Sequence, residues 1–416
     1  MIEFLGLPYQ TIIAAAVVPA FMHFFGVFMQ VHFEAKRYGL RGLTEAEMPR
    51  LRQSLRERWP TLIPLLLLIS ILVSGRTPYL AAFVGITSCA IVGLSTVPRG
   101  NRPGHWVLLA VLHLVLVAIA FSQLMLEAKL GLFALGVAIA EVGRRYGGVR
   151  GRIDHAVLLE ALETGAKYAL AVGAAAATVG IVIGVVTLTG VGFKISFIIT
   201  SAAQSIATAL GAIVPTSLAT PQSLTLLCAL VMTGVVCILM GCGIPTTANY
   251  IIMVTVAAPT LVQLGVQPLV AHFFVFYYGV LADITPPVAL AAYAAAGMAG
   301  SDPFKTGNTA FRLGLAKALV PFVFVFSPSL LLVAKGFTMQ DFLITFSGCV
   351  LGITVLAAAM SRFFLVEMRR WEQALCLGAA LLMVAPSLVA TIVGVLLIAP
   401  VVARHVTALR ASPSPA

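Results

Sequence analysis

The chain has 416 residues, of which 60% are hydrophobic and only 10% are charged, and its mean hydropathy is +1.04. This composition excludes a soluble globular domain, and the recurring apolar stretches of membrane-spanning length predict an all-α polytopic integral membrane protein. The net charge of +11 does not indicate nucleic-acid binding, because the basic residues lie in loops between apolar runs, as the positive-inside rule describes.

The predicted apolar segments, in chain order, are 9–31, 60–75, 78–97, 106–123, 126–143, 168–190, 195–214, 221–241, 244–264, 268–298, 310–334, 340–361 and 374–402. Two basic loops, 34–58 and 144–167, are predicted to face the cytoplasm, which sets the orientation of a multi-pass membrane protein. Within the first loop, Thr44 and Glu47 form a capping-box pattern. This pattern predicts an amphipathic helix over 43–58, either at the membrane interface or as a solvated linker.

Glycine and proline interrupt the apolar run at 241–250. Pro245 has no N–H to donate, so a helix is expected to break there. Thr246, Thr247 and Asn249 follow, and a helix that begins near Thr246 would point N–H groups and a positive dipole end at an anion. Freed carbonyls and hydroxyls at such a break also suit a hard cation such as Na⁺. The alternative is a plain kink or loop between two spans.

A carboxylate occupies an apolar segment at Asp283, one of two acids in the stretch 195–304, which contains no Lys and no Arg. A charged group at membrane depth is costly and therefore indicates a functional site. Thr285, Pro286 and Pro287 follow it and predict a second helix break, which frees the carbonyls four residues before each proline. Asp283 is predicted to ligate Na⁺, to carry a proton, or to cap the half-helix that follows.

Enzyme chemistry is not indicated. The sequence has no phosphate-binding Gly-Lys loop, no pair of histidines at helical spacing and no nucleophile elbow. We therefore expect no catalytic residue and no cofactor. An integral membrane enzyme is the disfavoured alternative, because paired catalytic residues are missing. His272, alone on an aromatic segment, is expected to be a packing residue with a satisfied hydrogen bond.

The motifs at both breaks resemble the large permease domain of TRAP transporters. The motifs that carry the resemblance are Gly-Cys-Gly-Ile-Pro-Thr-Thr-Ala-Asn-Tyr (241–250), Ala-His-Phe-Phe-Val-Phe-Tyr-Tyr (271–278), Asp-Ile-Thr-Pro-Pro-Val-Ala-Leu-Ala-Ala-Tyr (283–293) and the residues around Gly-Ser-Asp-Pro-Phe-Lys-Thr-Gly (300–307). More narrowly, the chain is similar to the fused 4TM/12TM permeases that work with TAXI-type substrate-binding proteins. The resemblance is strongest over 152–335, weaker over 1–95 and poor over 98–145.

The resemblance implies an elevator-type, inverted-repeat transporter in the membrane lipid. Such a permease lies in the cell inner (cytoplasmic) membrane and imports an organic anion, such as a dicarboxylate or oxo-acid. The import is driven by a gradient of Na⁺, the expected coupling ion, or of another ion, and an extracytoplasmic substrate-binding protein delivers the anion. A small four-helix permease domain is the second expected partner. Carried onto this chain, the candidate Na⁺ ligands are Gly241, Gly243, Asp283 and Thr285, and the candidate substrate-binding residues are Thr246, Thr247, Asn249, Pro286 and Pro287.

The sequence departs from the family pattern in the first repeat. The family has break motifs in both repeats, whereas a Pro-Pro dipeptide occurs here only at 286–287. We therefore expect the first repeat to be missing and its segment to be a separate partner. The alternative is a truncated, transport-inactive membrane fragment or assembly subunit. The predicted regions are N-terminal helices with the basic linker (1–145), a second repeat (146–335), C-terminal helices (336–405) and a disordered tail (406–416).

Overall fold

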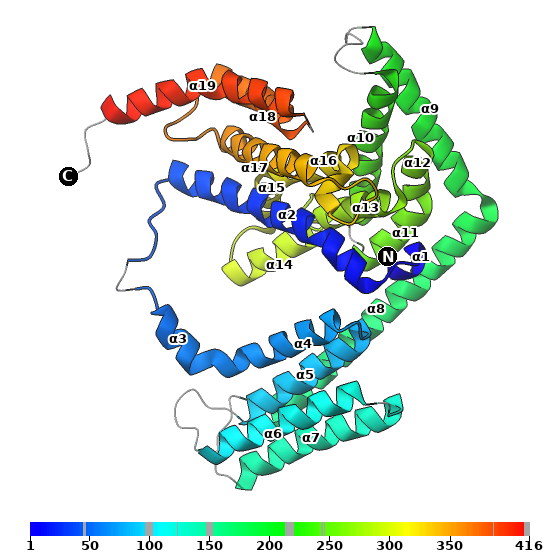
Figure 1. Cartoon of the computed structure of the whole chain (residues 1–416), viewed down its shortest axis with the longest axis vertical. Helices are drawn as coiled ribbons and strands as arrows, with labels where there is room; N and C mark the ends of the chain where they lie inside the picture. Colours follow the sequence, from blue (N-terminus) through cyan, green and yellow to red (C-terminus); the bar gives the residue numbers. More distant parts are fainter. Residues whose placement is uncertain are drawn as a thin grey trace. The chain divides into compact units, whose positions relative to one another are not determined.

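The structure, a computed structural model, describes residues 1–44, 47–95, 103–122, 124–146, 153–212, 220–242, 244, 246–385 and 387–411. All regular elements in these residues are helices, from α1 (Ile2–Leu5) to α19 (Leu388–Ala411) (Figure 1). Seven helices of the described part are long and apolar enough to cross a membrane. The predicted all-α polytopic class is therefore confirmed.

The chain divides into two compact units, one made of Met1–Leu40 with Val172–Ala416 and the other of Arg41–Ala171. The long helix α8 (His155–Thr189) contributes residues to both. The predicted region boundaries near residues 145 and 335 stay predictions.

The first unit surrounds α13, a helix that is buried along most of its length. The elements of this unit are α1, α2 (Tyr9–Arg37), the end of α8, α9 (Val191–Gly211), α10 (Pro221–Gly241), α11 (Thr246–Val256), α12 (Ala258–Gln263), α13 (Pro268–Ala282), α14 (Leu290–Ala299), α15 (Pro303–Gly314), η2 (Leu315–Leu319), α16 (Val320–Phe326), η3 (Pro328–Leu331), α17 (Met339–Ser361), α18 (Arg370–Val384) and α19. Phe274 of α13 is fully buried together with Met22, Leu230 and Phe324 from α2, α10 and α16. Between helices in a bilayer, such side chains stabilise the fold through close van der Waals packing.

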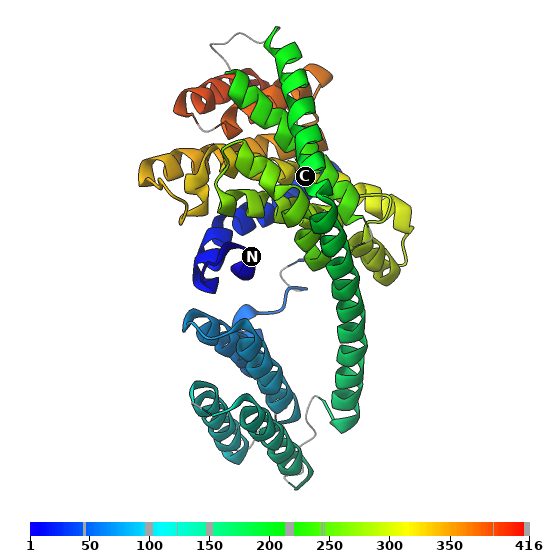
Figure 2. The same cartoon turned by 90° about the vertical axis from the view of Figure 1, so that its right-hand side faces the viewer.

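Helices that follow one another in the chain pack in pairs within this unit. The pair α9 and α10 lie side by side, and α17, α18 and α19 pack in succession, from orange to red in Figure 2. Helix α2 packs on α17 and on the two short elements η2 and η3. Segments from both ends of the unit therefore share one core.

Polar contacts fix the last turns of α2. The Gln30 side chain donates to the Arg312 carbonyl at 3.0 Å and accepts from the Ala316 N–H at 3.2 Å. Glu34 forms an ion pair with the Arg312 side chain, and Ser361 donates to the Gln30 carbonyl. This end of α2 is consequently tied to α15, η2 and α17.

The second unit consists of shorter helices. They are α3 (Leu51–Arg58), η1 (Trp59–Leu62), α4 (Ile63–Val73), α5 (Pro78–Ser95), α6 (Pro103–Phe121), α7 (Leu126–Tyr146) and the start of α8. Trp59 and Trp106 stack with their ring centroids 5.3 Å apart. The buried His113 ring bonds to the Ser88 hydroxyl at 2.8 Å and to the Leu109 carbonyl at 2.7 Å, so both of its nitrogens have partners.

The helix predicted over 43–58 begins later than expected. Glu47 does accept hydrogen bonds from the hydroxyl and N–H of Thr44, at 2.7 and 2.8 Å, and these bonds lower the pKa of its carboxyl. They close a single turn, however, and the helix starts only at Leu51. The reason is Pro49, which disfavours helical conformation in the residue before it.

Several of the predicted segments are divided, including 310–334, which spans the end of α15, η2, α16 and η3. The run 244–264 forms α11 and α12, and 268–298 forms α13 and α14, the latter interruption being predicted. The prediction of one apolar segment over 374–402 is wrong, because α18 ends at Val384 and α19 begins at Leu388. Ala385 has an extended conformation with ψ of 136°, as expected for a residue that precedes a proline.

Candidate functional site

The first predicted break lies between α10 and α11. Helix α10 ends at Gly241, Cys242 is extended with φ −64° and ψ 111°, and α11 begins at Thr246. Pro245 has no N–H to donate to the carbonyl of Gly241, four residues before it in the chain. This carbonyl accepts a hydrogen bond from the Ile244 N–H instead, at 3.3 Å. The helical ladder is thus interrupted where the sequence predicts it.

Asn249 holds this break closely against α13. It is 1% exposed, and its Nδ2 donates to the Cys237 carbonyl at 3.4 Å. A Cβ atom on Gly241 would lie 2.3 Å from that Nδ2 and 2.5 Å from Ala282 Cβ, and one on Gly279 would lie 3.2 Å from the same Nδ2. Only glycine therefore fits at position 241. The Oδ1 of Asn249 is buried and has no hydrogen-bond partner within the described part of the chain.

The second predicted break follows α13. The helix ends at Ala282, the peptide bond between Pro286 and Pro287 is cis, and α14 begins at Leu290. The prediction that two carbonyls are left unpaired here is wrong. The carbonyl of Ala282 accepts from the Thr285 N–H at 3.0 Å, and that of Asp283 accepts from the Ala291 N–H at 3.1 Å. The turn after α13 and the start of α14 supply the donors that the prolines lack.

A hydrogen bond joins the two breaks directly. The Thr246 hydroxyl donates to Asp283 Oδ2 at 2.6 Å, although the two residues are 37 positions apart in the chain. Thr246 is the first residue of α11, so the half-buried Asp283 carboxylate lies at the N-terminal, positive end of that helix.

The remaining predicted site residues are distributed around this pair. Thr285 is buried, and its hydroxyl donates to the Leu281 carbonyl at 2.8 Å, which leaves its lone pairs free. Thr247 is exposed beside Thr246, and Pro287 is exposed in the turn after α13. Gly243 lies outside the described residues. The roles of these residues as Na⁺ ligands or substrate contacts stay predictions.

A buried tyrosine on α11 and a buried histidine on α13 contact each other. The Tyr250 hydroxyl and His272 Nδ1 are 2.8 Å apart, and His272 is 9% exposed. The packing role predicted for His272 agrees with this contact. The sequence analysis does not single out Lys317 or its partner His23. The signal that could have identified Lys317 is a cation within an apolar stretch of membrane-spanning length.

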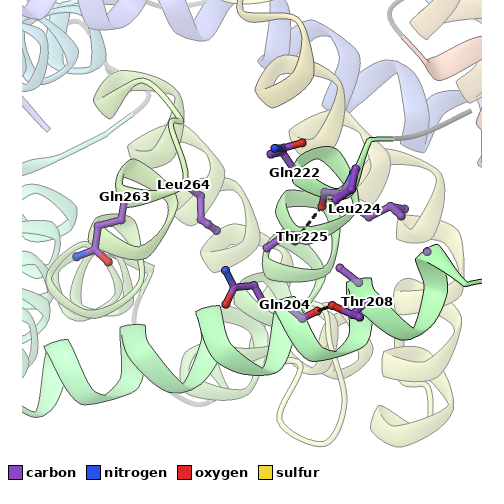
Figure 3. Close-up of a pocket in the computed structure, with 10 residues that line it drawn as sticks. Gln204, Thr208, Gln222, Leu224, Thr225, Gln263 and Leu264 are labelled. Atoms are coloured by element: carbon purple, nitrogen blue, oxygen red, sulfur yellow. Dashed lines mark hydrogen bonds between the residues drawn. The ribbon is translucent and has the colours of Figure 1, made fainter. Parts of the chain in front are cut away.

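A separate pocket of about 700 Å³ lies between α9, α10 and α12 (Figure 3). It is lined by Gln204, Ala207, Thr208, Gly211, Pro221, Gln222, Leu224, Thr225, Gln263 and Leu264. Its polar groups are carboxamides and hydroxyls, and the hydroxyl protons of Thr208 and Thr225 are donated to carbonyls of their own helices. An anion would therefore meet no cationic side chain among these lining residues, and none of them belongs to the two breaks.

Residues 1–339 match the family model of the tripartite ATP-independent periplasmic transporter, DctM component. The chain belongs to this family. As a DctM component it is a multi-pass permease component of a TRAP transporter rather than an enzyme, and its family implies a substrate-binding protein as partner. The matched range runs through 98–145, where the motifs resemble the family least. Comparisons with curated proteins and with solved structures gave no match.

Proposed function

We propose that this DctM component couples Na⁺ entry to the import of an organic anion, such as a dicarboxylate or oxo-acid, across the cell inner membrane. A TAXI-type extracytoplasmic protein delivers the anion, and a small four-helix permease domain is the second proposed partner. The hydrogen bond between Thr246 and Asp283 carries the proposal, because it brings both helix breaks and the intramembrane carboxylate to one place.

The charges at this place explain how a cation would promote anion binding. The N-terminal end of α11 attracts negative charge, but the Asp283 carboxylate already lies there. A second anion at the same helix end would be repelled by this carboxylate. A cation beside Asp283 removes the repulsion, so the anion binds well only after the cation. The proposed coupling therefore has a defined sign, in which Na⁺ raises the affinity for substrate.

Oxygen atoms for such a cation come from both breaks. Asp283 offers the carboxylate, and Thr285 offers the hydroxyl lone pairs that its bond to Leu281 leaves free. The Gly241 carbonyl and the buried Asn249 Oδ1, which has no partner in the described part, lie on the α10–α11 side. Hard cations prefer such oxygen ligands. Thr246, Thr247 and the turn at Pro286 and Pro287 are the proposed substrate contacts. Asn249, which the sequence predicts as a substrate contact, is only 1% exposed and is proposed as a cation ligand instead.

Uptake into proteoliposomes tests the proposal. The full chain would be reconstituted with its binding protein, with and without the first-repeat segment and the four-helix domain, and a panel of labelled dicarboxylates and oxo-acids would be offered under an inward Na⁺ gradient. We expect Na⁺-dependent uptake by the assembled system. Uptake that is the same with K⁺ in place of Na⁺ would refute Na⁺ coupling. No uptake of any anion by the complete system would favour the transport-inactive alternative.

A further inference from the structure

Lys317 is a buried ammonium group without a carboxylate partner. It is 5% exposed and lies in η2, inside the apolar stretch Pro303–Phe326 that is long enough to cross a membrane. Among the described residues, no Asp or Glu forms an ion pair with it, and its Nζ lies 2.9 Å from Nε2 of His23 on α2. A charge at such depth is costly, and a residue of this kind generally serves a function.

Close packing between α2 and η2 sets this contact. A Cβ atom on Gly26 would lie 3.2 Å from both the N and the Cβ of Lys317, so the two backbones approach as closely as glycine permits. His23 lies about one turn before Gly26 on the same face of α2. The imidazole is further held by Tyr277, whose ring centroid is 5.2 Å away in an edge-on arrangement.

The groups around the pair from each neighbouring element are neutral or already paired. From α13, the Tyr277 hydroxyl donates to the Lys317 carbonyl at 3.1 Å and the Tyr278 hydroxyl to the Ala318 carbonyl at 2.8 Å. Cys349 of α17 is a fully buried thiol, and α16 has no titratable residue. On α2 and α15, Glu34 and Arg312 pair with each other, and the second Glu34 oxygen has no hydrogen-bond partner in the described chain.

The distance between the two nitrogens limits how many protons the pair can hold. When Nζ donates, Nε2 must accept, so the imidazole is neutral with its proton on Nδ1. Two positive charges 2.9 Å apart would repel strongly in a buried site, which makes double protonation unfavourable. We propose that Lys317 and His23 form a buried proton-binding pair that holds one proton, apart from the Thr246–Asp283 site.

The proton balance is simple. In the occupied state the ammonium of Lys317 donates to the imidazole, and the pair carries one positive charge. Release sends this proton to solvent and leaves a neutral amine beside a neutral imidazole. His23 is the more exposed partner of the two. If the proposed transport function holds, occupancy of this pair adds a pH dependence to uptake.

Hydrogen–deuterium exchange at the histidine C2 position, read by mass spectrometry from pH 5 to 9, tests the pair without any transport assay. We expect His23 to bind a proton at least about tenfold more tightly in Lys317→Met than in the wild-type chain, because the neighbouring charge is gone. Lys317→Arg keeps the charge and should leave His23 as in the wild type. His113, which has its own partners in the second unit, is the internal control. An unchanged His23 in Lys317→Met would overturn the proposal.

Thermal unfolding at several pH values tests whether the proton exchanges. The difference in melting temperature between the wild-type chain and Lys317→Met should change by several degrees between pH 6 and 9. For Lys305→Met, which removes an exposed lysine, the difference should stay constant. A constant difference for Lys317→Met would show a permanently charged ammonium and refute the proposal. Uptake by the assembled transporter should depend less on pH in Lys317→Arg than in the wild type. If no uptake occurs at all, the proposed transport function fails, but the hydrogen–deuterium exchange at His23 still tests the pair.

Discussion

Replacement of Gly241 by alanine tests the packing that brings the two breaks together. A Cβ atom there would lie 2.3 Å from Asn249 Nδ2 and 2.5 Å from Ala282 Cβ. Ordinary contacts begin near 3.4 Å, so both neighbours would have to move by about 1 Å, and such overpacking typically costs about 1–3 kcal/mol. The small propensity gain from alanine offsets less than this, because position 241 is the last residue of α10.

The assay is the apparent melting temperature of the purified full chain in detergent. For a chain of 416 residues each kcal/mol corresponds to roughly 1 °C, so Gly241→Ala should melt about 1–3 °C below the wild type. Gly297→Ala is the matched control, since a Cβ at that exposed helical position meets nothing within 4 Å. A Gly241→Ala chain that melts at or above the Gly297→Ala chain would refute the close packing of Asn249 against α10 and α13.

Three further substitutions examine the site and its supporting helix. Asp283→Asn removes the carboxylate charge, so the Na⁺ dependence of uptake by the assembled transporter should weaken. Half-saturation should require about tenfold higher Na⁺, which corresponds to about 1.4 kcal/mol. Unchanged Na⁺ dependence would show that Asp283 is not part of the ion site. Thr246→Val should lower stability by about 1.5–3 kcal/mol through loss of a hydrogen bond to a charged group, whereas Thr246→Ser should keep it, and equal melting of the two variants would contradict the bond. Tyr277→Phe should cost about 0.5–1.5 kcal/mol, because the Lys317 carbonyl retains its bond from the backbone, and Tyr79→Phe at an exposed position should cost nothing measurable.

Proline and glycine made the positions of the breaks predictable from the sequence. Pro245, Pro286 and Pro287 remove backbone donors locally, and local effects of this kind act whatever the rest of the fold does. Proline also explains why the helix predicted over 43–58 begins late. Pro49 disfavours helical conformation in the residue before it, so the helix begins only at Leu51 despite the capping pattern of Thr44. Local chemistry thus identified where the helices are interrupted.

Contacts between distant segments could not be predicted in the same way. The bond between Thr246 and Asp283 depends on how α11 packs against α13, which no local pattern encodes. The donors that satisfy the carbonyls of Ala282 and Asp283 likewise come from a turn geometry that only the folded chain shows. Lys317 was overlooked because its burial depends on α2, nearly 300 residues earlier in the chain.

Adjacent tyrosines on α13 fix the alignment of that helix along η2. Pro321 cannot donate to the Lys317 carbonyl, and the hydroxyls of Tyr277 and Tyr278 bind this carbonyl and that of Ala318. A shift of α13 by a single residue would break both bonds together and leave the two tyrosine hydroxyls without these partners in a buried layer. Helix α13, which ends at Ala282 directly before the second break, and the segment after α15 are therefore held in one register. The two bonds link the position of the second break to that of η2.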